Sequence, residues 1–227
     1  MPSDYASHLT SINSAGAGAL RRRSGLDPKR AFDVVFALVL LPLVLPVIFV
    51  LWALIRLQGG AGAPGFFRHT RVGRNGRPFD CMKLRTMVPD ADLSLAALLA
   101  HDPRAREEWA RDVKLQDDPR VTRFGRILRK TSLDELPQIF NVLAGDMSFV
   151  GPRPIPAEEL ERYGRAKYAY LSVRPGITGS WQVSGRNDVD YDTRIALDVG
   201  YARDRSLAGD LRILLRTVGV VLRKTGC

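Results

Sequence analysis

The chain has 227 residues, of which 45% are hydrophobic, and a formal net charge of +10. Its two cysteines, Cys81 and Cys227, lie far apart and outside any CxxC or Cys/His cluster, which argues against a disulfide framework and a structural zinc site. The basic excess suits anionic partners such as lipid headgroups, nucleotides, phosphates or nucleic acid, and a membrane-proximal face alone would explain much of it.

The N-terminal part of the chain divides into a polar leader and an apolar segment. Residues 1–28 are rich in Ser, Ala, Gly and Arg, and we expect them to be disordered. Residues 29–57 are predicted to be a membrane helix, because Val34–Ile55 holds no polar side chain and about 20 apolar residues suffice to cross a bilayer. Pro42 and Pro46 each remove a backbone donor near its middle, so we expect a bend there.

Positive charge flanks the apolar segment on both sides. The flanking residues are Arg21, Arg22, Arg23, Lys29 and Arg30 upstream, and Arg56, Arg68, Arg71, Arg74 and Arg77 downstream. Because positive charge marks the cytoplasmic side, both ends are predicted to be cytoplasmic, which a re-entrant helix hairpin satisfies. A kinked signal-anchor helix that spans the bilayer is the alternative that hydropathy alone favours. A cleaved signal peptide is disfavoured by the length of the run.

Residues 58–227 are expected to form one cytoplasmic domain, so that the whole chain is α+β and mostly helical. A glycine-rich turn at 73–76 predicts a small β-hairpin over 66–87. Arg174–Gly176 is predicted to be a turn. Helical patterns cover 91–110 with a break near Pro103, 121–143 after a basic start, 155–172, and about 210–224.

The last of these helices carries leucines on one face and arginines on another. This pattern suits an amphipathic helix that lies on an anionic membrane surface. A core helix with a basic outer side fits the same pattern nearly as well.

An acidic pair, Asp134 and Glu135, stands where a helix is predicted to begin. Ser132 and Glu135 have the spacing of a capping box, and Asp134 could instead be the N-cap with Pro137 in the first turn. Taken alone, such a pair is usually structural.

Basic residues surround the acidic pair and favour a functional interpretation. Arg126, Arg129 and Lys130 precede it, and Arg153 follows in a rigid Gly-Pro-Arg-Pro sequence. Cations neutralise phosphate charge, and an aspartate oxygen can attack phosphorus to give an acyl-phosphate. A second carboxylate could position or deprotonate the acceptor. The segment therefore indicates phosphoryl chemistry.

Five ordered motifs carry a wider resemblance. They are KRAFD at 29–33, RVGRNGRPF at 71–79, KLRTM at 83–87, DPRVTRFGRILRKTSLDELPQIFNVLAGDMSFVGPRP at 118–154 and RPGITGSWQVSGRND at 174–188. Over roughly residues 29–224 the chain resembles the bacterial sugar transferase family, the monotopic polyprenyl-phosphate phosphoglycosyl transferases that begin surface-glycan assembly. The long block at 118–154 is specific enough to outweigh the structural interpretation of the acidic pair.

The resemblance implies a mechanism and a location. Asp134 matches the nucleophile that attacks a UDP-sugar with release of UMP, before undecaprenyl phosphate accepts the phosphosugar. Glu135 matches the paired carboxylate, assigned to the acceptor or to the metal site, and Mg²⁺ is the implied cofactor, with Asp134 near it. The family's membrane helix is re-entrant, which places the chain at the cytoplasmic face of the bacterial inner membrane. The positions expected around the phosphates are Lys83, Arg85, Arg129, Gln138 and Arg153.

The chain departs from the family pattern at two positions. Leu84 replaces the usual Phe in KLRTM, and His69 stands where Gln is common, which could alter local hydrogen bonding. RPGITGSWQVSGRND resembles the exopolysaccharide-initiating relatives and hints at a hexose such as glucose or galactose. The short polar leader makes the chain look like a stand-alone catalytic unit.

Three alternatives remain beside the transferase. One is a membrane-tethered module that binds nucleic acid or anionic lipid, the second is an inactive scaffolding family member, and the third is a true span with the domain outside the cytoplasm. The transferase interpretation expects a UDP-sugar, undecaprenyl phosphate and inner-leaflet lipid as partners, and no nucleic acid. It does not determine whether the protein forms a homodimer.

Overall fold

The computed structural model of the chain describes residues 27–59, 64–112, 115, 117–185 and 189–222. Except for Asp27 and Pro28, the leader predicted at 1–28 lies outside these residues. The elements in chain order are α2 (Pro28–Gln58), β1 (Phe66–Val72), η1 (Arg74–Gly76), β2 (Pro78–Leu84), α3 (Ala91–His101), α4 (Pro103–Asp112), α5 (Arg123–Thr131), η2 (Leu133–Glu135), α6 (Gln138–Ala144), β3 (Ser148–Val150), α7 (Ala157–Glu161), η3 (Gly164–Ala166), α8 (Lys167–Ser172), β4 (Gly176–Thr178), η4 (Trp181–Val183), α9 (Tyr191–Asp204) and α10 (Leu207–Leu222). The mostly helical α+β class is confirmed.

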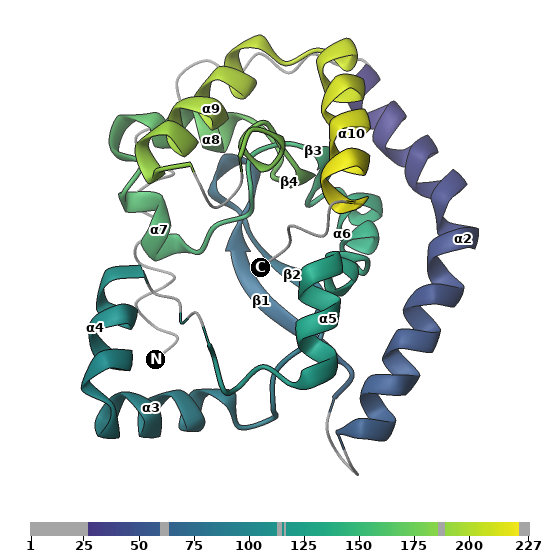
Figure 1. Cartoon of the computed structure of the whole chain (residues 1–227). Helices are drawn as coiled ribbons and strands as arrows, with labels where there is room; N and C mark the ends of the chain where they lie inside the picture. The colour runs from purple at the N-terminus through teal and green to yellow at the C-terminus, as the bar shows by residue number, and fades with distance from the viewer. Residues whose placement is uncertain (1–26, 60–63, 113–114, 116, 186–188, 223–227) are drawn as a thin grey trace.

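The membrane segment forms a single helix, α2, of 31 residues that contains Pro42 and Pro46. Asp27 caps its start by accepting a hydrogen bond from the Lys29 amide over 3.2 Å. Figure 1 shows α2 as a bowed helix whose ends turn towards the rest of the molecule and whose middle stands away from it. It is long and apolar enough to cross a membrane, and only 11% of its most apolar window is buried. Re-entry through one leaflet stays a prediction.

The first turns of α2 are fixed to the rest of the molecule by polar contacts. Lys29 Nζ pairs with the buried Asp210 of α10 over 2.5 Å. The Arg30 guanidinium donates to two carbonyls at the end of α6, over 2.5 and 2.9 Å. The buried Asp33 carboxylate accepts from the Ser148 hydroxyl over 3.0 Å at the start of β3. The charged residues of KRAFD therefore hold the helix at a fixed orientation.

The predicted hairpin is present, and α6 packs against β2. β1 and β2 pair antiparallel from Phe66–Leu84 to Val72–Pro78. Asn141 of α6 binds the backbone of β2 through both ends of its amide, donating to the Asp80 carbonyl over 2.8 Å and accepting from the Met82 amide over 3.0 Å. The side chain of Asn141 thus joins helix and hairpin into one unit.

A short parallel pair of strands, β3 and β4, was not predicted. The turn expected at Arg174–Gly176 is wrong, because Gly176 begins β4 and faces Ser148 of β3. The two backbone segments approach so closely that a Cβ on Gly176 would lie 2.1 Å from the amide nitrogen of Gly151. The glycine of the RPG sequence thus serves a close backbone approach rather than a turn.

The helical predictions hold at 91–110, where α3 and α4 meet at Pro103, and fail in detail at 155–172. That segment is broken into α7, η3 and α8 around Gly164, whose φ of +50° is outside the helical region. Helix α9 was not predicted. With α7 and α8 it encloses a second buried cluster around Tyr163 and Tyr170.

Candidate active site

The acidic pair lies in a tight turn between two helices. α5 begins at Thr122, whose hydroxyl accepts from the Gly125 amide over 2.9 Å, and ends at Ser132, which is left-handed with φ 57°. The chain then makes one 3-10 turn through Asp134 and Glu135, and α6 begins only at Gln138. Both predicted caps are wrong, because Ser132 ends a helix with its backbone and Pro137 precedes the next one.

Asp134 is a buried carboxyl group with an unusual pKa. Its side chain is 7% exposed, and burial raises its pKa to about 6. Lys83 lowers this pKa, Glu135 raises it, and Arg129 lowers it. At neutral pH the group is therefore mostly ionised, yet poorly hydrated, which suits a nucleophile.

Lys83 brings the hairpin to the acidic turn. Its ammonium group pairs with Glu135 Oε1 over 2.7 Å, with both side chains about three-quarters buried. The ammonium group also acts on Asp134, so that one cation serves two adjacent carboxylates. The predicted Lys83, Asp134 and Glu135 therefore lie together.

Arg129 reaches the site from the last turn of α5. Its Nε donates to the Thr86 hydroxyl over 2.9 Å, and burial lowers its pKa while Asp134 and Asp118 raise it. Gly125 permits this arrangement, because a Cβ there would lie 2.1 Å from the Thr86 carbonyl oxygen. The close approach of α5 to the chain after β2 thus sets the position of Arg129.

Arg153 lies in the segment between β3 and α7. Its guanidinium lies over the Trp181 ring, 5.9 Å from the centroid. Burial raises the pKa of the Cys81 thiol, and the charges of Lys83, Glu135 and Arg153 all act on it. The structure therefore brings Arg153 to the vicinity of Lys83 and Glu135.

The two other predicted phosphate-binding residues make different contacts. Arg85 donates from Nε to the Pro64 carbonyl over 2.9 Å and lies over the Phe67 ring at 5.8 Å. Gln138 begins α6 and is 2% exposed. Both remain predictions as substrate-binding residues.

Arg71 lies in the vicinity of Lys83 and Arg153, and the sequence prediction did not include it among the site residues. Its charge acts on Cys81 together with those of Lys83 and Arg153. Its position in β1 could have indicated this. Successive residues of a strand point to opposite faces, so His69 and Arg71 share a face with Cys81 and Lys83 of β2, whereas Arg68 lies on the other face.

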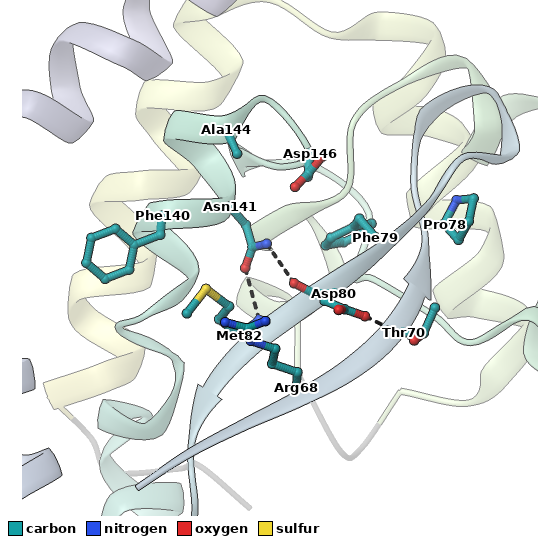
Figure 2. A pocket seen from close by; sticks show the side chains of 10 residues that line it. All are labelled: Arg68, Thr70, Pro78, Phe79, Asp80, Met82, Phe140, Asn141, Ala144 and Asp146. Atoms are coloured by element: carbon teal, nitrogen blue, oxygen red, sulfur yellow. Dashed lines mark hydrogen bonds between the residues drawn. The ribbon is translucent and has the colours of Figure 1, made fainter. Parts of the chain in front are cut away.

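A groove of about 700 Å³ opens on the opposite face of the hairpin, against α6. Figure 2 shows its lining, in which Asn141 binds the backbone of β2 and Thr70 donates to Asp80. The groove contains neither member of the acidic pair. It is lined by Arg68, Thr70, Pro78, Phe79, Asp80, Met82, Phe140, Asn141, Ala144 and Asp146.

The acidic pair is compatible with Mg²⁺, the cofactor that the motifs imply. Within the described residues no group of three or more His, Cys, Asp or Glu side chains could enclose a metal ion. Mg²⁺ does not need such a cage, because it commonly binds through one or two carboxylates together with substrate phosphates. Asp134 and Glu135 supply two adjacent oxygen donors, and the raised pKa of Asp134 is the mark of a buried carboxylate that a further cation would stabilise.

The comparisons with known proteins agree with the motifs. The model of the bacterial sugar transferase family matches residues 25–224. An undecaprenyl-phosphate galactose phosphotransferase of Salmonella typhimurium is 52% identical, covering 91% of this chain and 43% of that protein. The exopolysaccharide production protein ExoY of Sinorhizobium fredii is 46% identical, covering 92% of this chain and 91% of that protein. A UDP-glucose:undecaprenyl-phosphate glucose-1-phosphate transferase of Caulobacter vibrioides is 40% identical over 86% of this chain and 69% of that protein.

The chain thus spans less than half of the Salmonella relative and nearly the whole of ExoY. The match over residues 25–224 includes α2, the hairpin and the acidic turn. The chain belongs to the bacterial sugar transferase family.

Proposed function

We propose that the protein transfers a sugar phosphate from a UDP-sugar to undecaprenyl phosphate, as the first membrane step of exopolysaccharide or other surface-glycan synthesis. The activities for which the Salmonella and Caulobacter relatives are named support the reaction class, and the name of ExoY supports the pathway. The observation that carries the proposal is the buried Asp134, which lies in the electrostatic range of Lys83 and Arg129 and beside Glu135.

In the first half of the reaction, an Asp134 oxygen attacks the phosphorus that carries the sugar. The bond between that phosphorus and the bridging oxygen breaks, and UMP leaves with the electron pair. An acyl-phosphate between Asp134 and the sugar phosphate remains. Lys83 and Arg129 offset the charge that gathers on the phosphate oxygens, and Arg153 orients the diphosphate.

In the second half, a phosphate oxygen of the polyprenyl phosphate attacks the same phosphorus. The Asp134 carboxylate departs, and a polyprenyl diphosphosugar forms. Glu135 positions or deprotonates the acceptor, and Lys83 holds Glu135 in place over 2.7 Å. The carboxylate thereby returns to its starting state.

Asp134 and Glu135 would hold Mg²⁺, which when bound supplies positive charge to the phosphates. The residues of the chain supply the remaining requirements. Burial of Asp134 excludes water from the nucleophile, which protects an acyl-phosphate from hydrolysis.

The location of the site supports work at the cytoplasmic face of the bacterial inner membrane. UDP-sugars are cytoplasmic, and the acceptor phosphate lies at the bilayer surface. α2 is mostly exposed and apolar, so that it would dip into the membrane while its two ends stay with the domain. A site held at the headgroup plane reaches both substrates.

The proposal is tested by incubating the purified protein with Mg²⁺, undecaprenyl phosphate and a panel of UDP-sugars. We expect release of UMP with at least one hexose donor, together with a lipid-linked diphosphosugar. Salt-sensitive binding of DNA without UMP release from any donor would instead favour a nucleic-acid-binding module.

A further inference from the structure

Arg71 and Arg153 lie in neighbouring backbone segments although they are far apart in sequence. The Val72 amide donates to the Ile155 carbonyl over 2.9 Å. The buried Tyr170 hydroxyl bridges the same two residues, donating to the Val72 carbonyl over 2.9 Å and accepting from the Ile155 amide over 3.2 Å. The backbone next to Arg71 is therefore fixed against the backbone that follows Arg153.

The two guanidinium groups repel one another. Burial lowers the pKa of Arg71, and the positive charge of Arg153 lowers it further, while the Glu159 carboxylate raises it. Among the described residues, the ion pairs are Lys29–Asp210, Lys83–Glu135, Arg120–Asp118 and Arg194–Glu159, so neither arginine is neutralised by one. Two adjacent guanidinium groups in this state are suited to an anion with several charged oxygens.

The arginine pair and the acidic turn act electrostatically on the same buried group. The charges of Lys83, Glu135, Arg71 and Arg153 all act on the buried thiol of Cys81 on β2. A phosphate between the two arginines would therefore lie near the carboxylates that are proposed to handle its phosphorus.

His69 holds the Arg71 side chain in place. Arg71 Nη2 lies 2.9 Å from His69 Nδ1, so the ring accepts the bond only when Nδ1 carries no proton. Partial burial lowers the pKa of His69, as do Arg71 and Lys83, while Glu158 and Asp92 raise it. The imidazole is thus neutral at neutral pH, and in acid its proton would break the bond and repel Arg71.

We propose that Arg71 is a further phosphate-binding residue, which holds a substrate phosphate together with Arg153, and that His69 is the residue that positions it. The phosphate belongs to the UDP-sugar or to the polyprenyl phosphate. The inference rests on the proposed function and adds to it a residue from β1 and a dependence on pH that belongs to this chain.

The donor arm measures equilibrium binding to an Asp134→Asn parent, which removes both turnover and the titration of Asp134. UDP-galactose and UDP-glucose are the probes, with Mg²⁺ present. Arg71→Gln should raise the dissociation constant by about tenfold or more, the weakening expected from loss of a charge-assisted hydrogen bond. The matched control is Arg68→Gln, which removes the same charge from the opposite face of the hairpin and should leave binding unchanged.

The acceptor arm measures KM for undecaprenyl phosphate with Asp134 intact. A rise in this KM in Arg71→Gln, with donor binding unchanged, assigns the phosphate to the acceptor. If neither the donor nor the acceptor is bound more weakly than in Arg68→Gln, the inference is wrong. If neither the native protein nor the Asp134→Asn parent binds any UDP-sugar, the proposed function fails instead.

The His69 arm measures donor binding at about pH 7.5 and about pH 5.5, where the diphosphate of a UDP-sugar does not titrate. Donor binding to the parent should weaken in acid, whereas His69→Gln should bind equally at both values, because an amide oxygen accepts at either pH. An equal loss in both proteins would remove His69 from the proposal. Arg71→Lys keeps the charge without the fork and serves if Arg71→Gln does not fold.

Discussion

At the residue scale, the chemistry depends on the protonation of Asp134. Its pKa, raised by burial to about 6, means that the nucleophile is lost as the pH falls through that value. Lys83 is the largest influence that lowers this pKa, so Lys83→Met should raise it and move the acidic limb of the kcat profile to higher pH. A pH–rate series checks the shift. Arg126→Gln removes an exposed charge from α5 and should leave the limb in place, and an unmoved limb in Lys83→Met would contradict the electrostatic role.

Substitution of the acidic pair separates its two members. Asp134→Asn should reduce UMP release to the background rate because the nucleophile is gone, whereas Glu135→Gln should retain turnover lowered by about 10²- to 10⁴-fold. Membrane association should survive both changes. Full activity in Asp134→Asn would remove its assignment as the nucleophile.

The raised pKa of Asp134 also costs stability. A carboxyl group whose folded pKa exceeds its unfolded pKa stabilises the fold only while protonated, so this contribution is lost as the pH rises from 3.8 through about 6. The loss at neutral pH is about 3 kcal/mol. Asp134→Asn should therefore unfold at a higher temperature than the native protein, whereas Glu135→Gln, which breaks the ion pair with Lys83, should not. A lower midpoint for Asp134→Asn would contradict the burial argument.

At the scale of the elements, the attachment of α2 depends on buried charge. Lys29→Met would leave the Asp210 carboxylate buried with the Tyr201 hydroxyl, 2.9 Å away, as its described donor. Loss of one partner of a buried pair costs about 3 kcal/mol or more. The denaturation midpoint of the protein in nanodiscs should fall, and Lys130→Met, which removes an exposed lysine from α5, should change it little. Equal midpoints would mean that the pair does not hold the helix.

The elements that sequence predicted correctly carry local signals. Prolines mark the bend of α2 and the break at Pro103, and glycines mark the hairpin turn. β3 and β4 carried no such signal, because each has three residues and they pair only across the intervening helices. α9 was missed because it buries polar groups, among them Asp198 and Tyr201, rather than a simple apolar stripe.

The same distinction applies to the site. The motif around Asp134 and Glu135 lies in one continuous block, so sequence alone associated it with Arg129 and Arg153. The left-handed Ser132 that turns the pair inwards could not be read from the residue type. Arg71 could not be connected to Arg153, because the connection is the hydrogen bond between Val72 and Ile155.

At the scale of the whole molecule, two helices present apolar surface to the outside. The most apolar part of α2 is largely exposed. Helix α10, which is joined to α2 by the ion pair between Lys29 and Asp210, exposes a row of hydrophobic side chains. The row consists of Leu207, Leu211, Leu215 and Val218. Both helices are suited to contact with lipid.

The proposed topology is tested by labelling in intact cells. Cysteines introduced as Ser24→Cys or Gln58→Cys, in a chain with Cys81→Ala and Cys227→Ser, should both be shielded from an external impermeant reagent if α2 enters and leaves on one side. Labelling of one position alone would establish a span. The double substitution Pro42→Ala and Pro46→Ala should favour a span, because it removes the two prolines that bend α2 and a straight helix of this length reaches across the bilayer.

The central claim is that a buried carboxylate becomes covalently linked to the sugar phosphate. Intact-protein mass spectrometry after incubation with Mg²⁺ and an accepted UDP-sugar, without undecaprenyl phosphate, tests it most directly. We predict a mass increase of one sugar phosphate, localised to Asp134 by fragmentation, absent in Asp134→Asn and discharged when undecaprenyl phosphate is added. Rapid formation of the lipid product in a protein that never carries this mass increase, even under rapid quenching, would contradict the account.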